Sequence, residues 1–258
     1  MERELQFLVQ SAIQPEAPTS VVHYEVRHTR GIYEISREGI AVAEEFDPVR
    51  VMSALYERIQ VDALAAWPDG MLLRCLTART SDARYVLVGE KLWDRSRVAL
   101  QLIRDGFDVE GDDAAILHGA GLTAWPRPLR VCGADAPLPP LAPPRSELPG
   151  VGNEPEGRSW ALDLAKAGID WQITTGRVHG VISLEANYGG DTRLVELTQR
   201  EAARRLLSHC DWGPGISEQI RAVAQLLRGA RCCELRLGSL SEIAGAWPRV
   251  GCGRVAPN

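Results

Sequence analysis

The chain has 258 residues, of which 45% are hydrophobic and 24% are charged, and its formal net charge is −5. This composition is typical of a globular protein with one large domain, or one domain and a small appendage. The negative charge argues against a dedicated nucleic-acid-binding protein. No apolar run reaches the length of a membrane span, and the start lacks a basic segment followed by a long apolar core. We therefore expect a cytoplasmic protein without a nucleic-acid or membrane partner.

The six cysteines do not form the pattern of a metal site, because none of them belongs to a CxxC pair and no histidines follow at ligand spacing. Cys232 and Cys233 are adjacent in a strand-like stretch, so their side chains are expected on opposite faces. His118 and His179 stand alone. We expect reduced, structural thiols and structural histidines.

The N-terminal part predicts short strands followed by one helix. The stretches "VVHYEVRH" and "GIYEISREGIAVAEEF" alternate β-branched and aromatic residues with polar ones, as strands joined by tight turns do. In the next stretch Asp47 suits a helix cap and Pro48 suits the first helical position. The apolar stripe of this helix consists of Val51, Leu55, Ile59 and Leu64. We predict that residues 1–66 form a small β-rich region packed on the core.

Residues 67–258 predict an α/β domain that forms one compact unit with this region. "MLLRCLTA" and "RYVLVG" are expected as two strands, and residues 137–159, rich in proline and glycine, as an exposed loop. Residues 176–197 resemble a hairpin that turns at 188–191. Two helices are expected to start at capping boxes, Thr198 with Glu201 and Ser239 with Glu242. Strands and helices alternate, which favours the α/β class.

Residues 85–103, "YVLVGEKLWDRSRVALQLI", predict a buried strand, a glycine turn and an amphipathic helix. This is the layout of a phosphate-binding loop, whose pattern is G-x-x-x-x-G-K-[ST]. On this chain the pattern pairs Gly89 with the first glycine and Ser96 with the hydroxyl that holds Mg²⁺. Asp94 stands in place of the second glycine, and Arg95 in place of the lysine.

Both mismatches have physical consequences. Asp94 adds a negative charge beside the phosphates, which costs on the order of several kcal/mol in a partly desolvated pocket, and its Cβ limits the backbone freedom of a glycine. Arg95 keeps the positive charge, but as a planar fork instead of a point charge on a flexible stem. Lys91 would compensate for these two changes if its side chain faced the phosphate-binding pocket. The loop chemistry therefore argues against ordinary ATP binding.

Asp112 and Asp113 follow a short predicted strand after the helix of this loop. Paired carboxylates there would hold Mg²⁺, and one of them would accept a proton from an attacking hydroxyl. The alternative is a surface turn, because Gly and Asp are turn formers. On this motif alone the turn is favoured.

Together these segments resemble the kinase domain of the HPr kinase/phosphorylase family and, more closely, its shorter relatives. The resemblance covers most of the chain and is specific in the order and spacing of its segments. A Pro-Arg-Pro-Leu run typical of the shorter relatives is seen at residues 126–129. The matching segments, in chain order, are "LLRCLTA", "YVLVGEKLWDRSRVALQLI", "RDGF", "VEGDDAAIL", "WPRPLRV", "TRLVELTQREAARRLLSHC" and "CELRLGSLSEIAGAW".

The resemblance implies an HPr-kinase-like phosphate-loop fold and a set of site residues. In the family the loop binds ATP, Mg²⁺ sits on its hydroxyl residue, and an aspartate of the pair acts as base toward a serine of the acceptor. Carried over by position, Gly89 would contact the nucleotide and Ser96 and Asp112 would bind Mg²⁺. Asp112 or Asp113 would be the base. The glycine-rich signature of the phosphorylase activity is not visible.

Three positions that would touch phosphate depart from the family pattern: Arg74, which replaces a histidine, Asp94 and Arg95. Their coincidence favours a pseudokinase, an accessory or scaffold protein that binds a peptide or protein partner in a peptide-modification pathway. The alternative is an ATP- and Mg²⁺-dependent serine kinase acting on a peptide or small protein, because Ser96 and both aspartates are retained. An unrelated α/β domain with a chance likeness is a third interpretation. The resemblance also implies an oligomer.

Overall fold

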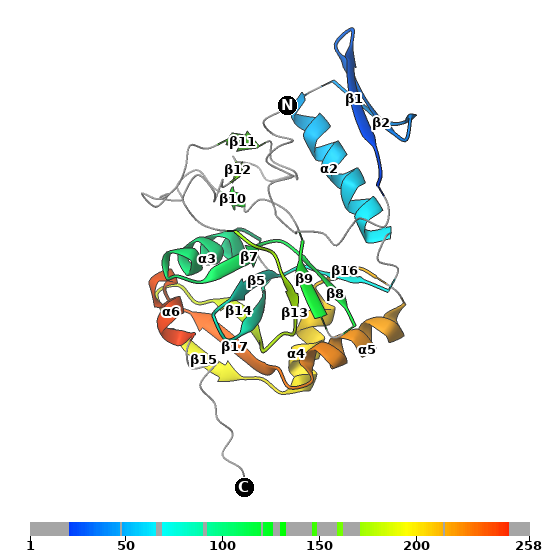
Figure 1. The fold of residues 1–258 in the computed structure, drawn as a ribbon. Coiled ribbons are helices and arrows are strands. Elements are labelled where there is room, and N and C mark those ends of the chain that lie inside the picture. Colours follow the sequence, from blue (N-terminus) through cyan, green and yellow to red (C-terminus); the bar gives the residue numbers. More distant parts are fainter. Residues whose placement is uncertain are drawn as a thin grey trace.

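The computed structural model describes residues 21–46, 48–65, 69–89, 92–119, 121–125, 130–132, 146–148, 159–161, 171–213 and 215–247. This part of the chain is mixed α/β, with a six-stranded sheet, a five-stranded sheet and two sheets of three strands (Figure 1). The predicted class is confirmed at this level. Within the same ranges, no helix is both long enough and apolar enough to cross a membrane.

The six-stranded sheet carries the segments of the candidate site and has the order β15-β17-β14-β6-β5-β7. Strands β6, β14 and β17 are parallel neighbours, whereas β5, β7 and β15 pair antiparallel. The carboxyl ends of the parallel strands therefore meet at one edge. The strands are β5 (Leu76–Arg79), β6 (Arg84–Val88), β7 (Asp108–Gly111), β14 (Gly180–Ala186), β15 (Arg193–Glu196) and β17 (Arg231–Leu237).

Helices cover both faces of this sheet (Figure 1). On one face, α3 (Leu92–Arg104), a short 3₁₀ turn (Leu240–Glu242) and α6 (Ile243–Ala246) enclose one apolar core. On the other face, α4 (Gln199–Leu207) and α5 (Ile216–Leu227) enclose a second. Cys233 belongs to the first core and Cys232 to the second, so the predicted opposite orientation is confirmed. Burial raises the pKa of the Cys232 thiol to about 11, which keeps it protonated.

The five-stranded sheet has the order β13-β9-β8-β4-β16 and shares the second core. The predicted single strand "MLLRCLTA" is wrong: β4 belongs to this sheet, β5 to the six-stranded one, and Arg74 and Cys75 connect them. The amides of these two connecting residues bond to the carbonyls of His209 and Asp113, which redirects the chain between sheets. The strands are β4 (Met71–Leu73), β8 (Ala115–His118), β9 (Gly121–Ala124), β13 (Thr175–Gly176) and β16 (Cys210–Trp212).

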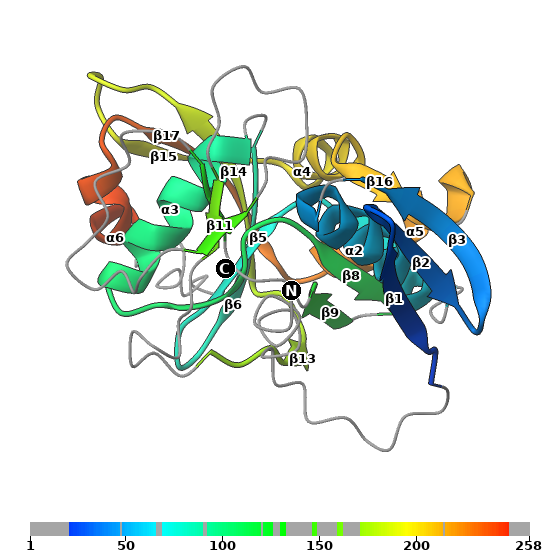
Figure 2. The same ribbon diagram turned by 90° about the horizontal axis from the view of Figure 1, so that it is seen from above.

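The N-terminal strands form an antiparallel meander, β1 (Tyr24–Thr29), β2 (Ile32–Arg37) and β3 (Ile40–Glu45), in that order across the sheet. Two-residue turns join the strands, and all four turn residues, 30–31 and 38–39, have positive φ, as tight hairpin turns require. Figure 1 shows the β1–β2 hairpin beside α2, and Figure 2 shows the three strands side by side with β1 at one edge.

Helix α2 (Pro48–Ala65) begins at the predicted proline, whereas Asp47 lies outside the described residues. Val51 and Leu55 are buried against Ile35 of the meander. Leu64 packs instead on the five-stranded sheet, so α2 bridges the two parts. Ile59 of the predicted stripe is 37% exposed and lies outside both contacts. The division at residue 66 remains a prediction.

The predicted hairpin between β14 and β15 is wrong, because β17 lies between them. β14 pairs with β17 in parallel, and β15 pairs with the other edge of β17. The predicted turn at 188–191 is present, since the Gly190 amide donates to the Asn187 carbonyl over 2.9 Å and Gly189 has a positive φ. A local sequence pattern gives the reversal but not the strand that inserts into it.

The first predicted capping box is confirmed and the second is wrong. Thr198 accepts from the Glu201 amide, and the Glu201 carboxylate accepts from the Thr198 amide. Ser239 precedes the 3₁₀ turn and makes no capping bond; its hydroxyl bonds to Ser241 instead. Glu242 does not complete the predicted box either, because its carboxylate accepts a hydrogen bond from the Thr192 hydroxyl.

The predicted loop at residues 137–159 also needs correction where it is described. Ser146–Leu148 forms strand β11, and Ser159 begins β12 (Ser159–Ala161). These strands form a small sheet with β10 (Arg130–Cys132), in the order β10-β12-β11. Backbone pairing does not depend on the side-chain alternation by which strands are recognised in a sequence, so a short strand in a proline-rich segment is easily missed.

Candidate functional site

The strand and the helix predicted within residues 85–103 are present, while the predicted turn between them falls partly on residues 90–91, outside the described residues. β6 ends at Val88, Gly89 is buried, and α3 begins at Leu92. A Cβ added to Gly89 would lie 3.3 Å from the carbonyl oxygen of Leu184, so the close approach to β14 favours a glycine here. Lys91 lies outside the described residues, and of Asp94 only the backbone is described, in the first turn of α3.

The structure brings Ser96 and Asp112 together. Ser96 lies near the start of α3, and Asp112 directly follows β7. The Ser96 hydroxyl donates to Oδ2 of Asp112 over 3.1 Å, and both residues are buried, at 6% and 3% exposure. Asp113 is 7% exposed. The alternative of an exposed surface turn is therefore wrong for this aspartate pair, which lies inside the molecule beside the loop helix.

Arg74 pairs with Asp113. Its Nη1 lies 2.8 Å from Oδ2 of the carboxylate, and its Nε bonds to Asp211 of β16. The Arg74 amide also donates to the His209 carbonyl over 2.8 Å. The arginine thus ties Asp113, one of the two candidate bases, to the edge strand of the five-stranded sheet. Asp211 was missed from the sequence, because 137 residues separate it from Arg74 and it belongs to no motif.

Arg95 is the unusual group of this site. It is 3% exposed, and within the described part of the chain its Nε and Nη1 have no hydrogen-bond acceptor. Burial lowers the pKa of its guanidinium, while the neighbouring Cys75, Asp113 and Asp112 act in the opposite direction. Burial also raises the pKa of the Cys75 thiol to about 12, so this neighbour is neutral. The two carboxylates compensate the arginine electrostatically but not by hydrogen bonding to those nitrogens, which is a costly arrangement.

The donor set fits a magnesium–phosphate group only in part. The oxygens of Ser96 and Asp112 are ligands that Mg²⁺ prefers, with phosphates and waters completing its shell. The orphan donors of Arg95 would suit an anionic oxygen. Asp113, in contrast, is neutralised by Arg74, which opposes a role as proton acceptor. Within the described ranges, no cluster of three or more His, Cys, Asp or Glu side chains would hold a metal by itself.

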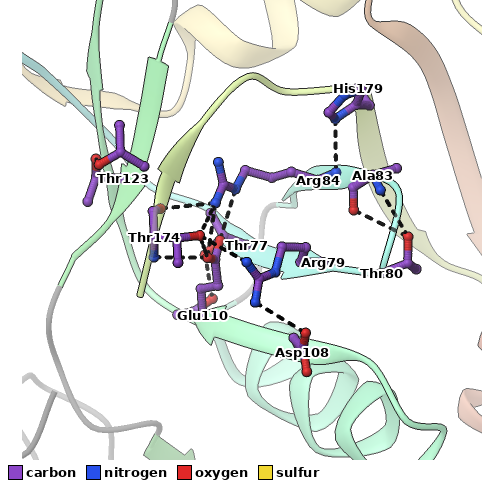
Figure 3. A network of polar contacts seen from close by, with 12 residues as sticks. Thr77, Arg79, Thr80, Ala83, Arg84, Asp108, Glu110, Thr123, Thr174 and His179 are labelled. Atoms are coloured by element: carbon purple, nitrogen blue, oxygen red, sulfur yellow. Dashed lines mark hydrogen bonds and ion pairs between the residues drawn. The ribbon is translucent and has the colours of Figure 1, made fainter. Parts of the chain in front are cut away.

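A second buried polar network lies at the opposite end of β6, around Arg84 and Glu110 (Figure 3). Nε and Nη2 of Arg84 lie 3.0 and 3.1 Å from the Glu110 carboxylate, and both side chains are almost fully buried. Thr174 donates to the same carboxylate through its amide and its hydroxyl, over 3.1 and 2.7 Å. The Arg84 amide donates to Nδ1 of His179, a structural role as expected. Because these groups satisfy one another far from Gly89, we assign the network to stability.

The arginines of α4 are only partly a solvated face. Arg200 and Arg204 are exposed. Arg205 instead donates to the Ser183 hydroxyl over 2.7 Å and to the buried carboxylate of Glu234. Ser183 lies opposite Val88 in the sheet, so this cluster flanks the end of β6 on the α4 face.

A scan of the chain against protein-family models gives no match, and a search of curated proteins gives none either.

Proposed function

We propose that this chain is a non-catalytic accessory protein with an HPr-kinase-like fold, which binds a peptide or protein partner. The observation that carries the proposal is the internal pairing of the candidate site. Arg74 neutralises Asp113, Ser96 bonds to Asp112, and Arg95 is buried. A phosphoryl-transfer enzyme needs a carboxylate that receives a proton; of the two candidates, Asp113 is part of an ion pair and Asp112 accepts from Ser96.

The departures at the loop support the same proposal. Arg95, which stands at the position of the lysine, is buried in the protein interior instead of extending toward a nucleotide. Within the described part of the chain, Nε and Nη1 of this buried guanidinium have no acceptor, as expected of a site whose former ligand no longer binds. The resemblance to shorter relatives that accompany peptide-modifying systems is the reason for expecting a peptide or protein partner.

One contact favours the alternative, an ATP- and Mg²⁺-dependent serine kinase. The Ser96–Asp112 contact keeps the hydroxyl and the carboxylate that would share a magnesium ion. When bound, such an ion would neutralise charge on the transferred phosphoryl group. Ser96 and Asp112 would hold it, Arg95 would neutralise the nucleotide, and Asp113 would have to leave Arg74 in order to accept the serine proton.

Calorimetric titration with Mg²⁺-ATP and Mg²⁺-GTP tests the proposal. We expect no binding heat from the native protein, and clear binding by an Asp94→Gly, Arg95→Lys double variant, because it restores the loop glycine and the flexible cation. Circular dichroism establishes that the variant is folded. Binding by the native protein at about micromolar affinity, lost in Ser96→Ala, would establish the kinase alternative. Silence from both proteins would contradict the family assignment.

A further inference from the structure

Strand β1 leaves one edge without a partner in the described structure. The sheet order β1-β2-β3 makes β1 an edge strand, and its register with β2 is regular over all six residues, from Tyr24↔Arg37 to Thr29↔Ile32. An edge strand of this kind presents unpaired amides and carbonyls to another strand. Figure 1 shows the β1–β2 hairpin projecting from the rest of the described chain.

The register identifies which backbone groups face outward. The backbone amide of Glu38 donates to the His23 carbonyl over 2.9 Å, so His23 forms its backbone hydrogen bonds toward β2. Because the direction alternates along an antiparallel strand, every second residue after His23 also bonds toward β2. The amides and carbonyls of Tyr24, Val26 and His28 therefore point to the open edge. The opposite edge of the meander is less suited to pairing, because β3 is bulged and its Val42 carbonyl accepts from Arg58 of α2.

The side chains of β1 are self-complementary. In an antiparallel pair of two β1 strands centred on Val26, Glu25 of each copy lies opposite Arg27 of the other. Glu25 and Arg27 are both exposed, on the face away from α2, and they now bond to each other over 2.7 and 2.8 Å. The same register places Tyr24 opposite His28 and Val26 opposite Val26. Opposite charges directly across strands stabilise such a pair, whereas like charges destabilise it.

The rest of the meander leaves room for this arrangement. Helix α2 packs mainly on β2 and β3, and it meets β1 only on the face that carries Tyr24 and Val26, which leaves the outer edge of β1 uncovered by this helix. Tyr24 is fixed on the face toward α2, since its hydroxyl donates to Asp62 of that helix over 2.5 Å. Arg37 donates to the same carboxylate. The edge strand is thus held in register before any second strand arrives, which lowers the entropic cost of pairing.

We propose that β1 is a dimerisation edge, and that its occupant is a second copy of this chain. The two meanders join through antiparallel β1 strands into one continuous six-stranded sheet, with two symmetric Glu25–Arg27 pairs across the two-fold axis. The interface is small, so the dimer is weak and reversible. This proposal is independent of the function proposed above.

Sedimentation velocity over a concentration series tests the edge. We expect the native protein to dimerise reversibly, and Glu25→Lys or Arg27→Glu to weaken the dimer by about tenfold or more, since each single variant places like charges across the axis twice. The Glu25→Lys, Arg27→Glu double variant restores complementarity, and so does an equimolar mixture of the two single variants. Glu44→Lys, on β3, is the matched control and leaves the dimer unchanged.

The rescue experiments separate a charge effect at the interface from a folding defect. A native protein that stays monomeric would overturn the proposal and would leave the edge to a different partner. A dimer that both single variants leave intact would also overturn it. So would a loss of dimer that neither the double variant nor the mixture restores.

Discussion

Replacing Glu110 by Ala is expected to lower the free energy of unfolding by about 3–5 kcal/mol. The carboxylate is fully buried and accepts from Arg84 and from Thr174. Its removal leaves the charge of Arg84, whose side chain is 6% exposed, without its counter-charge. Breaking a buried pair costs much more than its net contribution, because the remaining charge stays desolvated. Urea unfolding followed by circular dichroism measures the effect.

The control for this experiment is an ion pair at the surface. Glu196 pairs with Arg231 over 2.6 Å, but its side chain is 74% exposed. Glu196→Ala is therefore expected to change the free energy of unfolding by less than about 1 kcal/mol. An equal effect of the two substitutions would show that burial does not determine the contribution of the Arg84–Glu110 pair.

Gly238→Ala is expected to destabilise the protein by about 3 kcal/mol or more, or to prevent folding. A Cβ at this position would lie 1.9 Å from the carbonyl oxygen of Gly190. The obstacle is backbone, which cannot rotate away as a side chain can. The Gly238 carbonyl also accepts from Gly189, and its amide donates to Thr192. The close approach is where the connection from β14 to β15 passes the end of β17.

Gly245→Ala is the matched control for that substitution. Gly245 lies in α6, and an added Cβ would meet no atom within 4 Å. Alanine favours a helix over glycine, so we expect a gain of up to about 1 kcal/mol. Both variants are compared by thermal unfolding. If Gly238→Ala proved as stable as Gly245→Ala, the close approach of the β14–β15 connection to Gly238 would be contradicted.

The local parts of the fold were predictable because local pattern encodes them. Helix α2 starts at Pro48, α3 follows the Gly89 turn, and the Thr198 capping box begins α4. In each of these cases, neighbouring residues carry the signal. The proximity of Ser96 and Asp112 was expected only from the family resemblance, because the local motif alone favoured a surface turn.

The long-range parts were not predictable in the same way. No local pattern says that β17 inserts between β14 and β15, because strand order depends on which surfaces bury each other. The Glu110 network joins residues 26 and 64 positions apart, and Asp211 is still further from Arg74. Isolated charged residues look alike in a sequence whether they pair in the interior or face solvent.

The central claim of this account is that Asp113 serves the structure through Arg74 and is not held ready for chemistry. A double-mutant cycle with Arg74→Met and Asp113→Asn, followed by urea unfolding, tests it directly. The Arg74–Asp211 contact is lost in both legs that lack the arginine, so the cycle isolates the Arg74–Asp113 pair. We predict that Asp113→Asn destabilises the protein and that the coupling energy is about 1–2 kcal/mol. A coupling energy near zero, with Asp113→Asn more stable than the native protein, would contradict the claim, because removing a carboxylate poised for catalysis commonly raises stability.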